Sequence, residues 1–188
     1  MNTTSVTLLE RLRQPAEEEA WARFVQLYTP LIYHWARRAG LQDPDAADLV
    51  QDVFVVLVQK MPDFEYDQHK SFRSWLRTVT LNKWRDRQRR GAARPGSANH
   101  VALAELPCPE PDDMFGEAEY RQRLLARALE VLQPQFQPKT WTAFWEHGMQ
   151  GKPAAAIAAE LGLTTGAVYA AKFRVLSRLR ETLDGLLD

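Results

Sequence analysis

Arginines surround a tryptophan in the stretch "SFRSWLRTVTLNKWRDRQRR", which runs from Ser71 to Arg90. At 100° per residue, one side of a helix would carry Arg73, Arg77, Thr80, Trp84 and Arg87. Guanidinium groups bind phosphates, and an indole ring stacks on exposed nucleic acid bases. The pattern therefore predicts a surface for nucleic acid whose bases are accessible. For Trp84 alone, a position at the edge of the protein core explains the residue equally well.

A second segment with binding chemistry is "PAAAIAAELGLTTGAVYAAKFRVLSRLRE" near the C-terminus. It predicts a helix from Pro153, a left-handed turn at Gly162, and a second helix capped by Thr164 or Thr165. This is the helix-turn-helix pattern, whose second helix reads the DNA major groove with its N-terminal residues. We expect the contacts from Thr164, Thr165, Ala167, Tyr169, Lys172 and Arg174.

The apolar residues of that second helix are expected to pack inward, namely Val168, Phe173, Val175, Leu176 and Leu179. The alternative is a plain helical corner, because packed helices joined by a glycine turn are common in all-α proteins. Basic residues continue along the second helix to Arg178 and Arg180, and they favour DNA binding.

Residues suited to catalysis or metal binding are sparse. None of the four histidines, His34, His69, His100 and His147, lies with carboxylates at metal-ligand spacing. The single cysteine, Cys108, can form neither an internal disulfide nor a cysteine zinc site. The sequence therefore predicts no enzyme, no metal and no cofactor.

The elements that position these residues have helical periodicity almost throughout. A long helix is expected to end at Gly40 and to be kinked or split by Pro30, and the next one to be capped by Asp43 or Asp45. In the arginine-rich helix the core side is expected to hold Phe72, Trp75, Leu76 and Val79, and to turn polar after Val79. The expected fold is all-α.

The composition changes after Arg90, where prolines, small residues and acidic residues replace the helical pattern. Residues 96–117 hold five acidic residues and no basic one, although the whole chain has a net charge of zero. We expect two small helical domains, 1–93 and 117–188, joined by a flexible acidic linker at 94–116.

Composition and hydropathy indicate the compartment. The hydrophobic content is 45%, and no apolar run approaches the ~20 residues of a membrane span. The N-terminus "MNTTSVTLLERLRQ" lacks the pattern of a secretory signal. These features favour a cytoplasmic protein without membrane insertion.

The string "DLVQDVFVVL", followed by "SFRSWLRTVTLNKWRDRQRR", an acidic linker and a terminal helix-turn-helix, resembles a bacterial RNA polymerase sigma factor. The resemblance is to the small two-domain extracytoplasmic-function (ECF) group and covers nearly the whole chain. It implies that the chain directs core RNA polymerase to promoters and melts the downstream promoter element. The alternative is a helix-turn-helix transcriptional regulator that acts without core polymerase.

The resemblance also implies roles for individual residues. It places Asp48, Gln51, Asp52 and Phe54 in the segment that binds the polymerase clamp. It places Phe64, Arg73, Arg77, Asn82, Trp84 and Arg85 in the region that binds melted DNA. The helix-turn-helix would read the upstream element as duplex DNA. The implied partners are core RNA polymerase, promoter DNA in duplex and melted form, and an anti-sigma factor.

Three departures from the family pattern affect what can be transferred. The loop "FEYDQHKSF" is longer and more charged than the family's short loop. Ala167 stands where the family often has threonine, and Lys172 stands where an apolar residue is frequent. Promoter sequence, inducing signal, anti-sigma partner and controlled genes therefore do not follow from the sequence.

Overall fold

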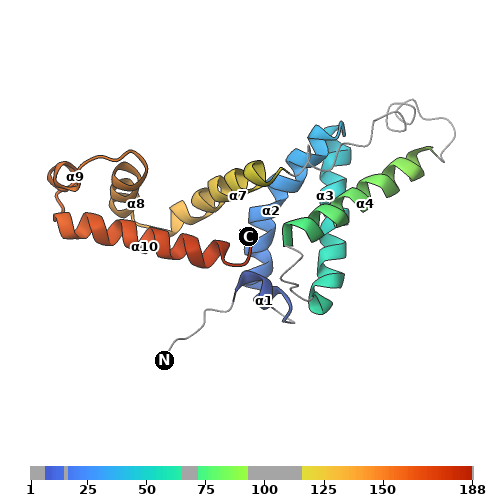
Figure 1. Ribbon diagram of the computed structural model, residues 1–188, viewed down its shortest axis with the longest axis horizontal. Coiled ribbons are helices and arrows are strands. Elements are labelled where there is room, and N and C mark those ends of the chain that lie inside the picture. Colours follow the sequence, from blue (N-terminus) through green and yellow to red (C-terminus); the bar gives the residue numbers. More distant parts are fainter. Residues whose placement is uncertain (1–6, 15–16, 65–71, 93–115, 188) are drawn as a thin grey trace. The chain divides into compact units, whose positions relative to one another are not determined.

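The computed structural model describes residues 7–14, 17–64, 72–92 and 116–187 (Figure 1). All regular structure in these residues is helical, which confirms the predicted all-α fold. The chain divides into two compact units. The N-terminal unit is Leu8–Leu124 with Gly185–Asp188, and the C-terminal unit is Leu125–Asp184 with Met1–Thr7, each over its described residues. The predicted linker, apart from Gly116, and the loop before Phe72 lie outside those residues.

The N-terminal unit is a set of helices built mainly on α2, α3 and α4. Its elements are α1 (Leu8–Leu12), α2 (Glu18–Arg38), α3 (Asp43–Lys60), the 3₁₀ turn η1 (Met61–Asp63), α4 (Phe72–Ala92) and the first half of α7 (Glu117–Leu132). Pro30 lies inside a continuous α2 and does not split it. Gly40 has φ of +87°, and the Leu41 amide donates to the Ala36 carbonyl at 3.2 Å, so the helix ends as predicted. The cap position of α3 is Gln42, and the predicted caps Asp43 and Asp45 lie inside the first turn of the helix.

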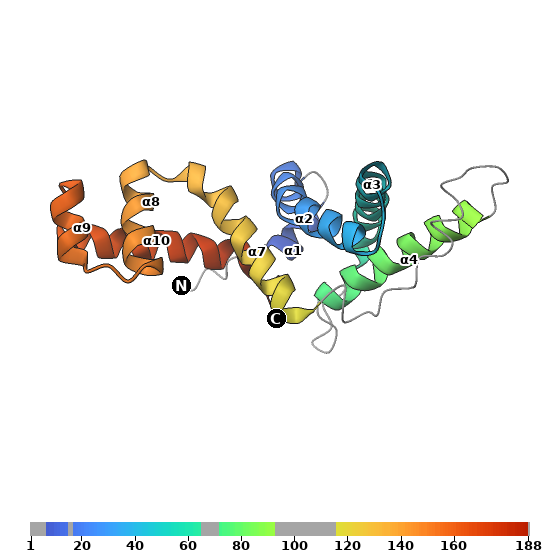
Figure 2. The same ribbon diagram turned by 90° about the horizontal axis from the view of Figure 1, so that it is seen from above.

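Aromatic side chains form the centre of this unit. The ring of Phe24 is fully buried, stacks on Tyr28 at 4.4 Å between centroids, and meets Phe54 and Phe72 edge-on at 6.1 and 5.8 Å. Edge-to-face and offset pairs of this kind are the favoured aromatic geometries. Because the four rings come from α2, α3 and α4, they tie these neighbouring helices together (Figure 2).

The first half of α7 packs in the N-terminal unit through Tyr120. The Tyr120 hydroxyl is within 2.8 Å of the Tyr28 hydroxyl and donates to the carbonyl oxygen of Leu186 at 2.9 Å. Its ring stacks on Trp35 with a centroid separation of 6.3 Å. The division between the units therefore falls within α7, after Leu124. The predicted domain boundaries at 93 and 117 remain a prediction.

The buried face of α4 is longer than predicted. Beyond Phe72 and Leu76 it continues through Thr80, Leu81 and Trp84, all of them buried. The Thr80 hydroxyl donates to the Leu76 carbonyl at 2.9 Å, which satisfies this polar group inside the core. The expectation that the core face turns polar after Val79 is wrong, because Leu81 and Trp84 are buried and α4 still contacts α3 at Arg87, which donates to Asp52.

The C-terminal unit holds the second half of α7 and the helix-turn-helix. Its further elements are the 3₁₀ turn η2 (Gln133–Gln135), α8 (Pro138–Phe144), the π-helical turn η3 (Trp145–Met149), α9 (Ala154–Leu161) and α10 (Thr165–Leu183). Both α8 and α9 pack against α10 (Figure 1). A cluster of small and branched side chains fills the space between them: Ala143, Ala154, Ile157, Ala158, Val168 and Ala171.

No single helix among the described residues is long and apolar enough to cross a membrane. In the described part of the chain, only α9 and α10 counted together reach the length and apolar content of a membrane span, and the chain bends by 102° between them.

Candidate nucleic-acid interface

The turn between α9 and α10 has the geometry of a helix-turn-helix. The chain bends by 102° between the two helices, within the range typical of this motif. Gly162 adopts the left-handed conformation, with φ of +65° and ψ of +41°. The Thr164 hydroxyl oxygen accepts a hydrogen bond from the Ala167 amide at 3.1 Å and caps α10. Both the predicted turn residue and one of the two predicted cap residues are confirmed.

An ion-pair bridge holds the segment before α9. The Lys152 ammonium contacts the Glu146 carboxylate at 3.0 Å and the Glu160 carboxylate at 2.5 Å. Hydrogen bonds to Glu160 and then Glu146 raise the pKa of Lys152 above its ordinary value. The bridge connects η3 to α9 and so helps to fix the approach to the turn.

The predicted reading residues of α10 differ in exposure. Thr164, Thr165, Tyr169 and Arg174 are exposed, whereas Ala167 and Lys172 are half-buried. Phe173 was expected to pack inward, and this is wrong, because its side chain is 70% exposed. The buried series of α10 runs through Val168, Ala171, Val175 and Leu179 at spacings of three and four, and Phe173 lies on the opposite side.

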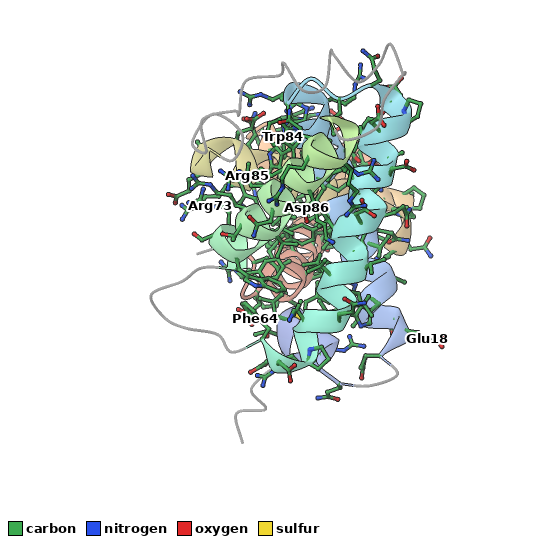
Figure 3. The ribbon with its side chains drawn as sticks, turned by 90° about the vertical axis from the view of Figure 1, so that its right-hand side faces the viewer. Glu18, Phe64, Arg73, Trp84, Arg85 and Asp86 are labelled. Carbon is green, nitrogen blue, oxygen red and sulfur yellow. The ribbon has the colours of Figure 1, made fainter. Side chains whose placement is uncertain are left out.

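Polar side chains surround a hollow of about 430 Å³ along the second half of α4. Asn82, Arg85, Gln88 and Arg89 line it, with spacings that keep them on one side of the helix. Figure 3 shows Arg85 on the side of α4 that faces away from α3. Asn82 and Arg85 were predicted from the sequence, whereas Gln88 and Arg89 were not. Helical spacing could have indicated both, because Gln88 follows Arg85 by three residues and Arg89 follows it by four. Amides and guanidinium groups at such a hollow can bind base edges and phosphates.

The other predicted residues of this region lie elsewhere. Phe64 is half-buried near the start of α4, where its ring contacts Trp75 at 4.6 Å and Phe72 at 5.9 Å between centroids (Figure 3). Trp84 is only 1% exposed, so its ring is a core residue and offers no face to a base, which corrects that expectation. Arg73 and Arg77 are half-buried, and Arg73 lies 4.0 Å from Glu117.

The predicted polymerase-binding residues of α3 divide between surface and core. Asp48 and Gln51 are exposed. The Asp52 carboxylate instead accepts a hydrogen bond from Arg87 Nε of α4 at 2.9 Å, and Phe54 is 9% exposed against Phe24. Burial removes Phe54 as a direct contact.

Two apolar side chains that the sequence analysis missed lie on the exposed face of α3. Val55 and Val58 are each 55% exposed. With Asp48 and Gln51 they form what we call the α3 face. The helical period alone does not show which side of α3 is covered.

Metal-ligating side chains do not gather in the part of the chain that the structure describes: no three of its histidine, cysteine, aspartate and glutamate residues come together as a potential metal site.

Comparison with known proteins identifies the family. Residues 24–94 match the sigma-70 region 2 family, and this segment contains most of α2 and all of α3 and α4. The chain is 33% identical over 127 residues to RNA polymerase sigma factor NccH of Alcaligenes xylosoxydans xylosoxydans. The aligned residues cover 66% of each protein. It is 26% identical over 182 residues to ECF RNA polymerase sigma factor RpoE of Cereibacter sphaeroides, covering 95% of this chain and 94% of RpoE.

A solved structure of CnrH in complex with the cytosolic domain of CnrY is 24% identical, with a TM-score of 0.37 over 94% of this chain and 95% of CnrH. That TM-score is too low to transfer any detail. The sequence matches suffice: the chain belongs to the ECF group of RNA polymerase sigma factors.

Proposed function

We propose that this chain directs core RNA polymerase to promoters, reads the upstream element as duplex DNA with α10, and holds the opened downstream element against α4. The observation that carries the proposal is the position of the polar hollow. It lies on α4, inside the segment that matches sigma-70 region 2. The regulator that acts without polymerase is disfavoured, because the relatives compared above are named as sigma factors.

Reading of duplex DNA is assigned to the exposed N-terminal half of α10. Thr165, Tyr169 and Arg174 are accessible there, and the Thr164 cap fixes the start of the helix. A capped helix that follows a tight turn can enter the major groove, where each base pair presents a distinct set of hydrogen-bonding groups. Thr164 supports this surface mainly by capping the Ala167 amide, which fixes the backbone at the start of α10.

Binding of opened DNA is assigned to the hollow on α4. Extruding a base from the duplex costs a few kcal/mol. Charge-assisted contacts from Arg85 and Arg89 to phosphates, with hydrogen bonds from Asn82 and Gln88 to base edges, can offset that cost. Because Trp84 is buried, stacking on its ring is not part of this proposal.

The polymerase contact is assigned to the α3 face. Asp48 and Gln51 supply polar contacts there, and Val55 and Val58 supply apolar area that the described residues leave exposed. An apolar centre with polar neighbours is typical of protein interfaces. Asp52 and Phe54 act through the fold, by holding α3 against α4 and α2. The catalytic step of RNA synthesis belongs to the polymerase in this scheme.

Transcription with purified core polymerase tests the proposed function. Genomic DNA of the source organism is transcribed with core polymerase in the presence or absence of the chain, and the RNA 5′ ends are mapped. We expect new start sites that share an upstream and a downstream sequence element. DNA binding without core polymerase, combined with unchanged start sites, would support the regulator instead. A cytoplasmic location and an anti-sigma partner remain predictions.

A further inference from the structure

Two aromatic side chains project from α10 into solvent. Phe173 is 70% exposed and Tyr169, one helical turn earlier, is 57% exposed. They are the two most exposed large hydrophobic side chains among the described residues. Residues four apart on a helix are neighbours, so the two rings form one surface, which we call the aromatic pair. Contiguous exposed apolar surface can mark an interaction site.

The aromatic pair is held on a well-fixed support. Val168, Ala171 and Val175 bury the opposite side of α10. The Tyr169 ring meets His147 edge-on, with 5.3 Å between centroids and an interplanar angle of 81°. His147 in turn lies with Nδ1 2.9 Å from the Lys152 carbonyl oxygen. The position of Tyr169 is therefore set by packing and by η3 as well as by the helix.

Basic and small residues surround the aromatic pair, and they suit contact with duplex DNA. Arg174 follows Phe173 directly and is exposed, and Lys172 is half-buried beside it. Cations suit the phosphates that border the major groove. Gly166 and Ala170 lie on the same exposed side and are small, so the helix backbone can approach the base edges closely. The apolar feature that such a surface meets in the major groove is the 5-methyl group of thymine.

We infer that Tyr169 and Phe173 contact thymine methyl groups in the duplex upstream element, and that Phe173 selects thymine there. The inference rests on the proposed function, in which α10 reads duplex DNA. It adds a specificity determinant that works through apolar contact rather than through hydrogen bonds.

The test removes only the methyl group from the DNA. The upstream element is first selected from a random duplex library placed ahead of a mapped start site, using holoenzyme reconstituted from core polymerase and the full chain. Each thymine of that element is then replaced in turn by deoxyuridine. Wild-type holoenzyme should bind one or two of the substituted duplexes about fourfold more weakly, as expected for one methyl group no longer buried. Holoenzyme with Phe173→Ala should lose the difference at the thymine that Phe173 contacts, and Tyr169→Ala should lose it at the thymine that Tyr169 contacts.

Matched variants separate methyl contact from other effects. Arg174→Ala should keep the difference between thymine and deoxyuridine while reducing the dependence of affinity on salt. Phe173→Leu should keep part of the difference. Because Phe173 is exposed, Phe173→Ala should leave the thermal unfolding midpoint of the chain close to that of wild type.

The outcomes distinguish this inference from the proposed function. Three results would overturn the inference alone: a selected element without thymine, equal wild-type binding to thymine and deoxyuridine duplexes, or a Phe173→Ala variant that discriminates like wild type at every position. The last result would assign the discrimination to side chains other than Phe173. Failure to enrich any upstream sequence would contradict duplex reading by α10, and the inference with it.

Discussion

At the scale of single residues, ion pairs and burial decide which side chains can serve as contacts. Arg87 has the sequence position of a DNA-binding arginine, yet its Nε donates to Asp52 at 2.9 Å and its guanidinium lies 3.7 Å from Asp48. Both partners of the closer pair are partly shielded from water, with 19% and 35% of their side-chain surface exposed. The pair therefore joins α3 to α4.

Removing the charge of Asp52 should loosen this junction. We expect Asp52→Asn to lower the free energy of unfolding by about 1 kcal/mol, because the acceptor of the Arg87 hydrogen bond loses its charge. Hydrogen exchange of the α3 and α4 amides measures this locally. Gln51→Ala, on the exposed side of α3, should stay within about 0.5 kcal/mol of wild type. Equal exchange in Asp52→Asn and wild type would show that the pair contributes nothing.

Residue-level predictions from the sequence succeeded where the signal is local. Gly162 and Thr164 were identifiable because a left-handed turn and a helix cap depend on neighbouring residues only. Phe173 was misplaced, and Trp84 could not be decided between the core and the DNA surface, because burial depends on which helix packs on which side. The helical period gives the angle between side chains but not the direction of the core.

At the scale of elements, the helix-turn-helix depends on the cap that begins α10. Thr164→Ala should destabilise the start of α10 by about 1 kcal/mol, because the Ala167 amide loses its acceptor. Thr164→Ser should retain most of the stability. The control is Thr165→Ala, whose hydroxyl makes no such cap. Hydrogen exchange at the Ala167 amide reports the difference, and identical exchange in the Ala variants at 164 and 165 would contradict the role of the cap.

A second element-scale contact joins α7 to α2 within the N-terminal unit. Glu119 accepts hydrogen bonds from Arg123 at 2.9 Å and from Arg38, and it lies 3.0 Å from His34 Nε2. Burial raises the pKa of this carboxyl, but the hydrogen bonds from Arg123 and His34 and the charge of Arg38 outweigh it, so the pKa is lowered.

The lowered pKa of Glu119 predicts a pH dependence of stability. A carboxylate whose pKa is lower in the folded state stabilises above its unfolded pKa, here 4.5, and loses that contribution as the pH falls through the folded pKa. Urea unfolding between pH 7 and pH 3 should therefore show a smaller acid dependence in Glu119→Gln than in wild type. Parallel pH profiles for the two proteins would contradict this assignment.

At the scale of the whole molecule, the proposal separates three tasks among three helices, and the polymerase contact falls to α3. Asp48→Lys should weaken binding to core polymerase about tenfold while leaving the fold intact, since the side chain is 69% exposed. Glu18→Lys is the matched charge reversal at an exposed position on α2 (Figure 3). Titration of core polymerase with labelled chain measures both, and equal affinities would remove α3 as the contact.

The whole-molecule fold class followed from the sequence because helical periodicity covers most of the described chain. The membership of the first half of α7 in the N-terminal unit did not follow, because it depends on Tyr120 reaching Tyr28 and Trp35, ninety-two and eighty-five residues earlier in the chain. The α3 face and the polar hollow likewise required knowledge of which surfaces the helices leave open.

The central claim is that α4 acts on opened DNA and α10 on duplex DNA. Permanganate reactivity of promoter thymines, measured with holoenzyme variants beside binding to the duplex promoter, tests it most directly. Asn82→Ala and Arg85→Ala should leave duplex binding near wild type and reduce thymine reactivity in the downstream element, whereas Arg174→Ala should weaken duplex binding first. Normal thymine reactivity in both α4 variants, together with unchanged duplex binding in Arg174→Ala, would contradict the assignment of opening to α4 and reading to α10.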